Sequence, residues 1–251
     1  MNPYGGSTPN AMTFTTLPLG ADDNEPVTEC FFFPGSKELF MNTPGFPHPP
    51  RRPARPAYRT DESAGRGKGL FATRALQTGD LVLSERPLLI TGRGIVVDRP
   101  AHFTDAQYVQ HALAQLENVL TVCVGRMRPA ARKAFLALAN SHTEDGSKPL
   151  SGIMRTNGLC LEGLRPGVEG ELSQYSATCK DISRLNHSCS PNVQPRWDLP
   201  SLSYQLYAVR DISEGEELTF QYTDVRPPAR YRQKDLEPYG FVCACPACTD
   251  A

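Results

Sequence analysis

The sequence lacks a long hydrophobic run, an excess of charge of either sign and an internal repeat. No stretch approaches the roughly 18 consecutive apolar residues of a membrane span, so we expect no membrane partner. The amino terminus has neither the basic start nor the apolar run of a secretory signal, which favours a soluble intracellular protein. With 26 lysines and arginines against 27 aspartates and glutamates, the net charge is −1. Such a balance gives no global field that attracts nucleic acid.

The eight cysteines are spread unevenly over the 251 residues. The disulfide framework of a secreted protein would distribute them more evenly in a shorter chain. Three of them instead form a CxCxxC group near the carboxyl end, and in a reducing compartment this spacing is typical of metal ligands. The group consists of Cys243, Cys245 and Cys248.

Residues 1–57 contain 11 of the 23 prolines and show no lasting hydrophobic period. Such a segment buries too little apolar surface to offset the entropy lost on ordering, so we expect it to be mostly disordered. The apolar residues 30–33 are the exception and could dock on the folded part. The basic, proline-rich stretch 51–59 fits a solvated linker, with a docking or nuclear-targeting element as the alternative.

From Tyr58 onward, short apolar runs alternate with turns, and between residues 104 and 141 the hydrophobic period lengthens. Spacings of three and four there predict an amphipathic helix capped near Thr104 or Asp105, followed by a second helix starting at Pro129. Runs rich in valine and leucine between glycines are typical of strands. We expect strands at residues 70–72, 80–85, 158–161, 202–209 and 217–222. The predicted fold class is mainly β with a helical insertion (α+β).

Three distant segments carry the candidate chemistry. They read GRGKGLFA at residues 65–72, RLNHSCSPN at residues 184–192 and GEELTFQY at residues 215–222. The glycine-rich turn is a weak signal alone, whereas the second segment is a strong one. In this order, and followed by CACPAC at residues 243–248, the segments closely resemble the SET-domain family of protein lysine methyltransferases. The resemblance covers roughly residues 60–251.

The resemblance implies a SET β-clip core in which the segment carrying Asn186 threads under a strand end and forms a pseudoknot. It divides the chain into a disordered segment (1–57), a SET domain (58–225) with a helical insertion at about 104–141, and a zinc-binding post-SET tail (226–251). No MYND zinc finger is expected, since Cys123 is the only cysteine between residues 91 and 150. The pattern is most similar to stand-alone SET proteins of the fungal type.

A structural zinc ion takes four tetrahedral ligands, one more than the CxCxxC group offers. In the post-SET arrangement of the family, the cysteine of the NHSC segment is the fourth ligand. The resemblance therefore implies one zinc ion per chain, which fastens the tail to the catalytic core. The implied ligands are Cys189, Cys243, Cys245 and Cys248.

The same resemblance implies a binding site for S-adenosylmethionine and makes Tyr222 the catalytic residue, which aligns the substrate amine with the methyl group. The implied cofactor-binding residues are Arg66, Gly67, Lys68, Asn186, His187, Tyr222 and Phe241. The implied lysine channel contains Asn157, Leu159 and Tyr239. Leu159 stands where the SET-and-MYND subclass carries a phenylalanine, which leaves the number of transferred methyl groups open.

These features predict a protein lysine N-methyltransferase that uses S-adenosylmethionine and zinc, in the nucleus, the cytoplasm or both. We expect a monomer whose partner is a protein substrate presenting a lysine, such as a histone tail, with no direct nucleic-acid partner. One alternative is a catalytically inactive SET module that acts as a protein-binding adaptor, although the retained Tyr222 and Asn186 argue against it. The other is a zinc-stabilised nucleic-acid binder, which would lack a net basic surface.

Overall fold

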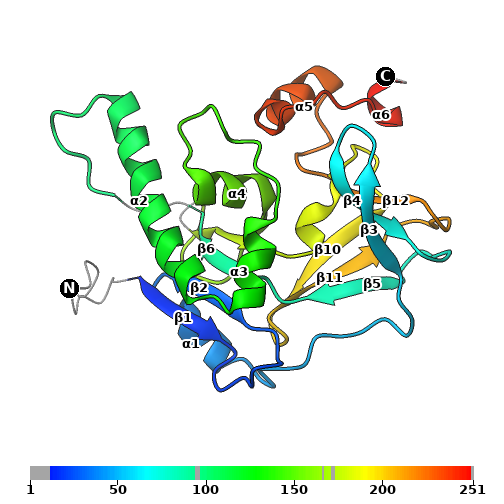
Figure 1. Cartoon of the computed structure of the whole chain (residues 1–251), viewed down its shortest axis with the longest axis horizontal. Coiled ribbons are helices and arrows are strands. Elements are labelled where there is room, and N and C mark those ends of the chain that lie inside the picture. The colour runs from blue at the N-terminus through cyan, green and yellow to red at the C-terminus, as the bar shows by residue number, and fades with distance from the viewer. Residues whose placement is uncertain (1–11, 94–96, 166, 171–172, 250–251) are drawn as a thin grey trace. The chain divides into compact units, whose positions relative to one another are not determined.

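The computed structural model describes residues 12–93, 97–165, 167–170 and 173–249, and the chain divides into two compact units (Figure 1). Each unit combines separate stretches of chain, so the units cross the predicted domain boundaries. Unit 1 comprises Met1–His48, Arg86–Lys180 and Leu199–Leu202, and unit 2 comprises Pro49–Glu85, Asp181–Asp198 and Ser203–Ala251. Among the described residues, no helix has the length and apolar character needed to cross a membrane.

Unit 1 contains a five-stranded sheet in the order β1-β2-β6-β8-β7. Neighbouring strands are antiparallel except β2 and β6, which are parallel. The strands are β1 (Thr13–Leu17), β2 (Thr28–Phe32), β6 (Leu89–Gly92), β7 (Gly158–Leu161) and β8 (Tyr175–Thr178). The helices are α1 (Ser36–Met41), α2 (Asp105–Arg126), α3 (Pro129–Leu136) and α4 (Pro149–Asn157).

Both predicted helices of the insertion are confirmed. The side chain of Thr104 accepts a hydrogen bond from the backbone of Gln107, whose side chain in turn accepts one from the Thr104 backbone, and α2 begins at the next residue. This reciprocal capping satisfies two backbone donors that an uncapped helix would leave unpaired. Pro129 occupies the first turn of α3. The green helices α2, α3 and α4 of Figure 1 share one apolar core with β2 and β6, in which Phe135 is fully buried.

The expectation of a mostly disordered segment at residues 1–57 does not hold for residues 12–57. Strands β1 and β2 and helix α1 lie there, and each fits between two prolines of the sequence. Because the prolines stand outside these elements, they break no ladder or helix hydrogen bond. Phe32 and Phe40 are fully buried and stack on each other. The segment therefore buries apolar surface although its average composition predicts disorder.

Two arginines fasten the loop between β1 and β2. The guanidinium of Arg86, only 1% exposed, forms an ion pair with Glu25 and donates to the backbone carbonyl of Pro26. Arg128 donates to three further carbonyls of the loop, those of Ala21, Asp23 and Glu25. The backbone carbonyls of this loop therefore accept hydrogen bonds from charged side chains of unit 1.

Unit 2 contains two small sheets, in the orders β3-β4-β12-β9 and β10-β11-β5. Their strands are β3 (Tyr58–Ser63), β4 (Gly67–Ala72), β5 (Leu81–Glu85), β9 (Asn186–His187), β10 (Val193–Asp198), β11 (Ser203–Ala208) and β12 (Glu217–Phe220). The helical elements are η2 (Ile182–Arg184), α5 (Ala229–Leu236), η3 (Glu237–Tyr239) and α6 (Pro246–Thr249). With the strands of both units and the helical insertion, the predicted α+β class is confirmed.

Candidate functional site

The segment at residues 186–192 is held against β12 by backbone and side-chain hydrogen bonds. Strand β9 pairs in parallel with β12, so that Asn186 lies opposite Thr219. Asn192, only 1% exposed, accepts a hydrogen bond from the Thr219 backbone at 2.7 Å and donates to the Glu217 carbonyl at 2.8 Å. An amide side chain that satisfies both a donor and an acceptor of a neighbouring strand fixes the two segments in register. The parallel pairing places β9 beside β12, and the threading of this segment into a pseudoknot stays a prediction.

Tyr222 follows the end of β12 and is anchored at two atoms. Its hydroxyl donates to the Leu185 carbonyl at 2.7 Å, and its backbone N–H donates to Nδ1 of His187 at 3.0 Å. Burial, reinforced by the neighbouring Tyr239, raises the pKa of Tyr222 above its ordinary value. The phenol is therefore protonated at neutral pH and acts as a hydrogen-bond donor.

Predicted cofactor and channel residues surround the Tyr222 ring. The ring centroid lies 4.8 Å from that of Tyr239, 5.3 Å from that of His187 and 6.4 Å from that of Phe241. Tilted and edge-on arrangements at these separations are favourable aromatic contacts. His187 comes from β9, whereas Tyr239 and Phe241 belong to one stretch that runs from η3 to Cys243, so the fold gathers two stretches that are distant in sequence around one phenol.

His187 connects Tyr222 to the cysteine group. Because the backbone N–H of Tyr222 can only donate, Nδ1 of His187 must accept, and the proton of the neutral imidazole lies on Nε2. Nε2 is 3.3 Å from Sγ of Cys189. Burial lowers the pKa of His187 to about 4, and the nearby charge of Arg232 acts in the same direction. The imidazole is thus neutral at pH 7 and donates its remaining N–H to sulfur.

A pocket of about 480 Å³ lies in unit 2 beside this aromatic group. The predicted cofactor-binding residues Arg66, His187 and Phe241 line it, together with Glu217 and Arg210. The wall therefore combines two aromatic rings with charges of both signs. A volume of several hundred Å³ is usual for small-molecule sites.

The glycine-rich segment and Glu217 form the charged side of the pocket. The β3–β4 hairpin turns at residues 64–66, and Gly67 has a φ of 68°, which favours glycine. Glu217 forms an ion pair with Arg66 and accepts a hydrogen bond from Asn186 at 2.8 Å, while Asn186 also lies 3.4 Å from the Lys68 carbonyl. Among the predicted residues, Arg66 and Asn186 are thus joined through one carboxylate.

Gly69 makes the close approach of these groups to β4 possible. A Cβ at this position would lie 2.5 Å from Oε1 of Glu217 and 3.1 Å from Nδ2 of Asn186. Any larger residue must therefore displace the carboxylate or the amide.

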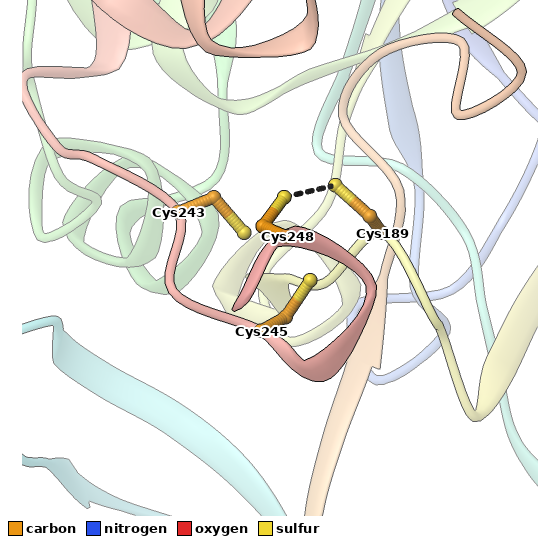
Figure 2. A group of neighbouring side chains, drawn as sticks. All are labelled: Cys189, Cys243, Cys245 and Cys248. Carbon is orange, nitrogen blue, oxygen red and sulfur yellow. Dashed lines mark hydrogen bonds between the residues drawn. The ribbon is translucent and has the colours of Figure 1, made fainter. Parts of the chain in front are cut away.

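The four predicted metal ligands lie together (Figure 2). Cys243, Cys245 and Cys248 come from the segment around α6, Cys189 follows β9, and the four sulfur atoms lie within 4.8 Å of one another. A tetrahedral zinc ion with Zn–S bonds of about 2.3 Å separates its sulfurs by about 3.8 Å. The Sγ atoms of Cys189 and Cys248 are 3.5 Å apart, too far for a disulfide. The cluster could hold a zinc ion after small side-chain adjustments.

Two predicted channel residues, Asn157 and Leu159, belong to unit 1 and are buried there. The amide of Asn157 donates to the carbonyls of Ala139 and Ile153, both at 2.7 Å. The bond to Ala139 holds the end of α4 against the loop after α3, and the bond to Ile153 lies within α4. Their role in a lysine channel stays a prediction.

Sequence reasoning did not assign a role to Asn192, Glu217 or Arg232. Asn192 and Glu217 stand inside the motifs at residues 184–192 and 215–222, and their places in these motifs are the sequence signal that marks them. Arg232 lies in the polar run ARYRQKDL, in which nothing distinguishes one arginine from its neighbours. Its contacts become visible only when α5 is placed beside the cysteines.

Comparisons with known proteins identify the family of the chain. A family model described as SET domain matches residues 67–223. A Schizosaccharomyces pombe protein named histone-lysine N-methyltransferase set5 is 28% identical over 193 residues, which are 76% of this chain and 50% of that protein. The human protein named histone-lysine N-methyltransferase SMYD3 is 47% identical over 68 residues, 27% of this chain and 15% of its own length. The chain thus matches half or less of these curated relatives.

Proposed function

Because the chain belongs to the SET domain family, we propose that it is a protein lysine N-methyltransferase, which transfers a methyl group from S-adenosylmethionine to a lysine side chain. The observation that carries this proposal is the arrangement around Tyr222. Its hydroxyl is fixed on the Leu185 carbonyl, and its ring contacts His187 and Phe241, which line the 480 Å³ pocket.

The residues of the pocket fit S-adenosylmethionine. When bound, this cofactor supplies an electrophilic methyl group on a sulfonium sulfur. Its adenine needs an apolar aromatic wall, for which Phe241 is suited, and its amino-acid end carries both charges. Arg66 offers a cation to a carboxylate and Glu217 an anion to an ammonium group. Gly67, Lys68, Asn186 and His187 complete the proposed binding residues, with backbone groups available beside the glycines.

Tyr222 is the proposed catalytic residue, and its task is alignment. The substrate amine must be neutral to act as a nucleophile, and with a reference pKa near 10.4 only about one lysine in 10³ is neutral at pH 7. Transfer into an apolar channel favours the neutral form, so no strong base is required. Since the phenol donates a hydrogen bond to the Leu185 carbonyl, the lone pairs of its oxygen face away from that bond and can orient the amine.

The proposed zinc ion would hold one wall of the pocket in position. Phe241 and Val242 directly precede Cys243 in the chain, and all three line the pocket. A metal that holds the cysteines therefore also holds this wall in place. We include residues 226–251 in the proposal as a post-SET tail.

The substrate and the setting of the reaction are also part of the proposal. The substrate class is a protein that presents a lysine, for which a histone tail is the first candidate, and the compartment is the nucleus or the cytoplasm. Asn157, Leu159 and Tyr239 are proposed to line the lysine channel.

The proposal is tested with the purified chain, labelled S-adenosylmethionine and an array of lysine-containing peptides that includes histone tails. We expect label on lysine, and a loss of at least about 10²-fold in methyl transfer for Tyr222→Phe, because a misplaced amine forfeits alignment. Tyr231→Phe is the matched control, since Tyr231 is an exposed tyrosine on α5. Cofactor binding without transfer to any peptide or cell-extract protein would instead identify an inactive adaptor.

A further inference from the structure

The cysteine cluster is contacted by a buried arginine that belongs to none of the sequence motifs. Arg232 lies on α5 and is only 7% exposed. Its Nε donates to Sγ of Cys189 at 3.2 Å, and one terminal nitrogen, Nη2, donates to Sγ of Cys248 at 3.3 Å. A single guanidinium thus bridges the one ligand of the SET core and the last ligand of the CxCxxC group.

The remaining donors of Arg232 fix the chain on either side of the cluster. Nη1 donates to the Pro227 carbonyl at 2.6 Å, and Nη2 donates to the Ala247 carbonyl at 2.8 Å. Pro227 precedes α5, and Ala247 lies in α6, so the side chain ties these two helices to each other. Because the planar guanidinium of Arg232 also donates hydrogen bonds to these two carbonyls, the fold fixes its position before any metal binds.

The next residue of α5 supports the same segment. Gln233 donates to the Cys243 carbonyl at 2.7 Å and accepts from the Cys243 backbone N–H at 2.9 Å. Helix α5 therefore holds the cysteine segment by two consecutive side chains, one through sulfur and one through the backbone.

The positive charge of Arg232 can compensate the negative charge of the metal-bound cysteines. Four thiolates around one divalent zinc carry a net charge of about −2, and a buried net charge needs a compensating partner. Hydrogen bonds from outer groups also orient the ligands of a metal site and adjust their electron density. Arg232 provides both a cation and two N–H···S bonds.

We propose that Arg232 is a positioning residue of the metal site, which orients Cys189 and Cys248 and compensates the charge of the metal-bound thiolates. This inference rests on the zinc site of the proposed function. Arg232 is not among the residues that line the pocket, and it acts through the two cysteines.

The test compares metal binding by the purified full-length chain and its variants. Zinc content is measured by elemental analysis, and zinc affinity by competition with a chromophoric chelator. We expect one zinc ion in the unaltered chain and an affinity lower by 10- to 100-fold in Arg232→Met. Arg232→Lys keeps the charge but lacks the planar fork that reaches both sulfurs and the carbonyls of Pro227 and Ala247 at once, so we expect a smaller loss. Arg230→Met is the matched control, because Arg230 is exposed on the same helix and contacts the Tyr231 ring; its affinity should not change.

A second readout separates a direct effect on sulfur from a general loss of packing. With cobalt(II) in place of zinc, the thiolate-to-metal charge-transfer band reports the electron density on sulfur, and we expect it to shift in Arg232→Lys but not in Arg230→Met. Should Arg232→Met fail to fold, as judged by circular dichroism, Arg232→Lys alone decides. Unchanged affinity and an unchanged band in Arg232→Lys would overturn the inference while the zinc site stands. An unaltered chain that binds no zinc would overturn the zinc site itself, and the inference with it.

Discussion

The helical core of unit 1 and the candidate site of unit 2 bury different kinds of side chain. Beneath α2, α3 and α4, unit 1 is filled by an apolar core in which Leu120 and Phe135 are fully buried. Around the candidate site, unit 2 instead buries the clustered thiols of Cys189 and Cys243 beside the imidazole of His187 and the guanidinium of Arg232. Apolar packing tolerates many arrangements of similar volume, whereas buried polar groups stabilise only the arrangement that satisfies each of them.

Buried charges also occur in unit 1, but they have another task. Glu29 is only 2% exposed and pairs with Arg126 of α2, and Arg86 binds the loop between β1 and β2. These contacts hold β2 on α2 and the loop between β1 and β2 on Arg86. In unit 2 the polar contacts instead converge on the pocket and the cysteines. The comparison predicts that unit 1 depends on packing and that the site of unit 2 depends on metal.

Removal of the metal is the change with the largest expected effect. A structural zinc ion contributes on the order of 10 kcal/mol to the folding of small zinc domains. After treatment of the zinc-loaded chain with a strong chelator, we expect faster amide hydrogen exchange in residues 186–189 and 222–249, because His187 links the cluster to the Tyr222 backbone. Exchange in α2, α3 and α4 should stay unchanged. Equal acceleration in both units would contradict the comparison.

The converse change is Phe135→Ala in the core of unit 1. A fully buried phenylalanine is replaced by a cavity, so we expect a loss of about 3–5 kcal/mol in the free energy of unfolding, measured by denaturant titration. The zinc content of the folded protein should remain one ion per chain. Leu136→Ala is the matched control, since Leu136 is the next residue of α3 and is 50% exposed; its effect should be small. Loss of zinc from folded Phe135→Ala protein would break the comparison.

A smaller change addresses the charged side of the pocket. In Gly69→Ala the new methyl group would displace the Glu217 carboxylate or the Asn186 amide, and with them the pairing of Arg66. We expect the dissociation constant of S-adenosylmethionine, measured by calorimetry, to rise about tenfold, equivalent to about 1.4 kcal/mol. Gly125→Ala serves as the control, because a Cβ there meets open space at the end of α2. That substitution should leave the affinity unchanged and raise stability by up to about 1 kcal/mol.

Much of this arrangement could be predicted where a local pattern decides the outcome. The start of α2 followed from Thr104 and the apolar spacing, and Pro129 marked the first turn of α3. The clustering of the four cysteines followed from the spacing of three of them and from the family resemblance, which added Cys189. Strands β1 and β2 were missed because average proline content conceals the short stretches between prolines, and their burial depends on partners such as β6.

The polar contacts of unit 2 could not be predicted for a different reason. Glu217 and Arg66 are 151 positions apart, and only the pairing of β4 with β12 brings them together. Arg232 differs from Arg230 solely in the direction of its side chain from α5. Because hydrogen bonds depend on ångström-scale placement, such roles emerge after the fold is known.

The smallest predicted effect concerns pH and a polar cluster of unit 1. Asp145 accepts a hydrogen bond from Nδ1 of His142 and one from Arg155, both at 2.6 Å. Burial by itself would raise the pKa of Asp145, but the hydrogen bonds from His142 and Ser147 and the charge of Arg155 lower it overall. The contribution of the charged carboxylate to stability is therefore present above the ordinary carboxyl pKa and is lost as the pH falls through the lowered value.

This sign gives the expected behaviour of Asp145→Asn. At pH 7 the variant should be less stable than the unaltered chain by less than about 1 kcal/mol, because the Asp145 side chain is 38% exposed and its ion pair is screened. The difference should shrink as the pH falls below about 4. Denaturant titrations from pH 7 to pH 3 measure it, with the adjacent exposed Glu144→Gln as the control. A gap that widened on acidification would mean that the protonated carboxyl, rather than the carboxylate, is the form that this cluster stabilises.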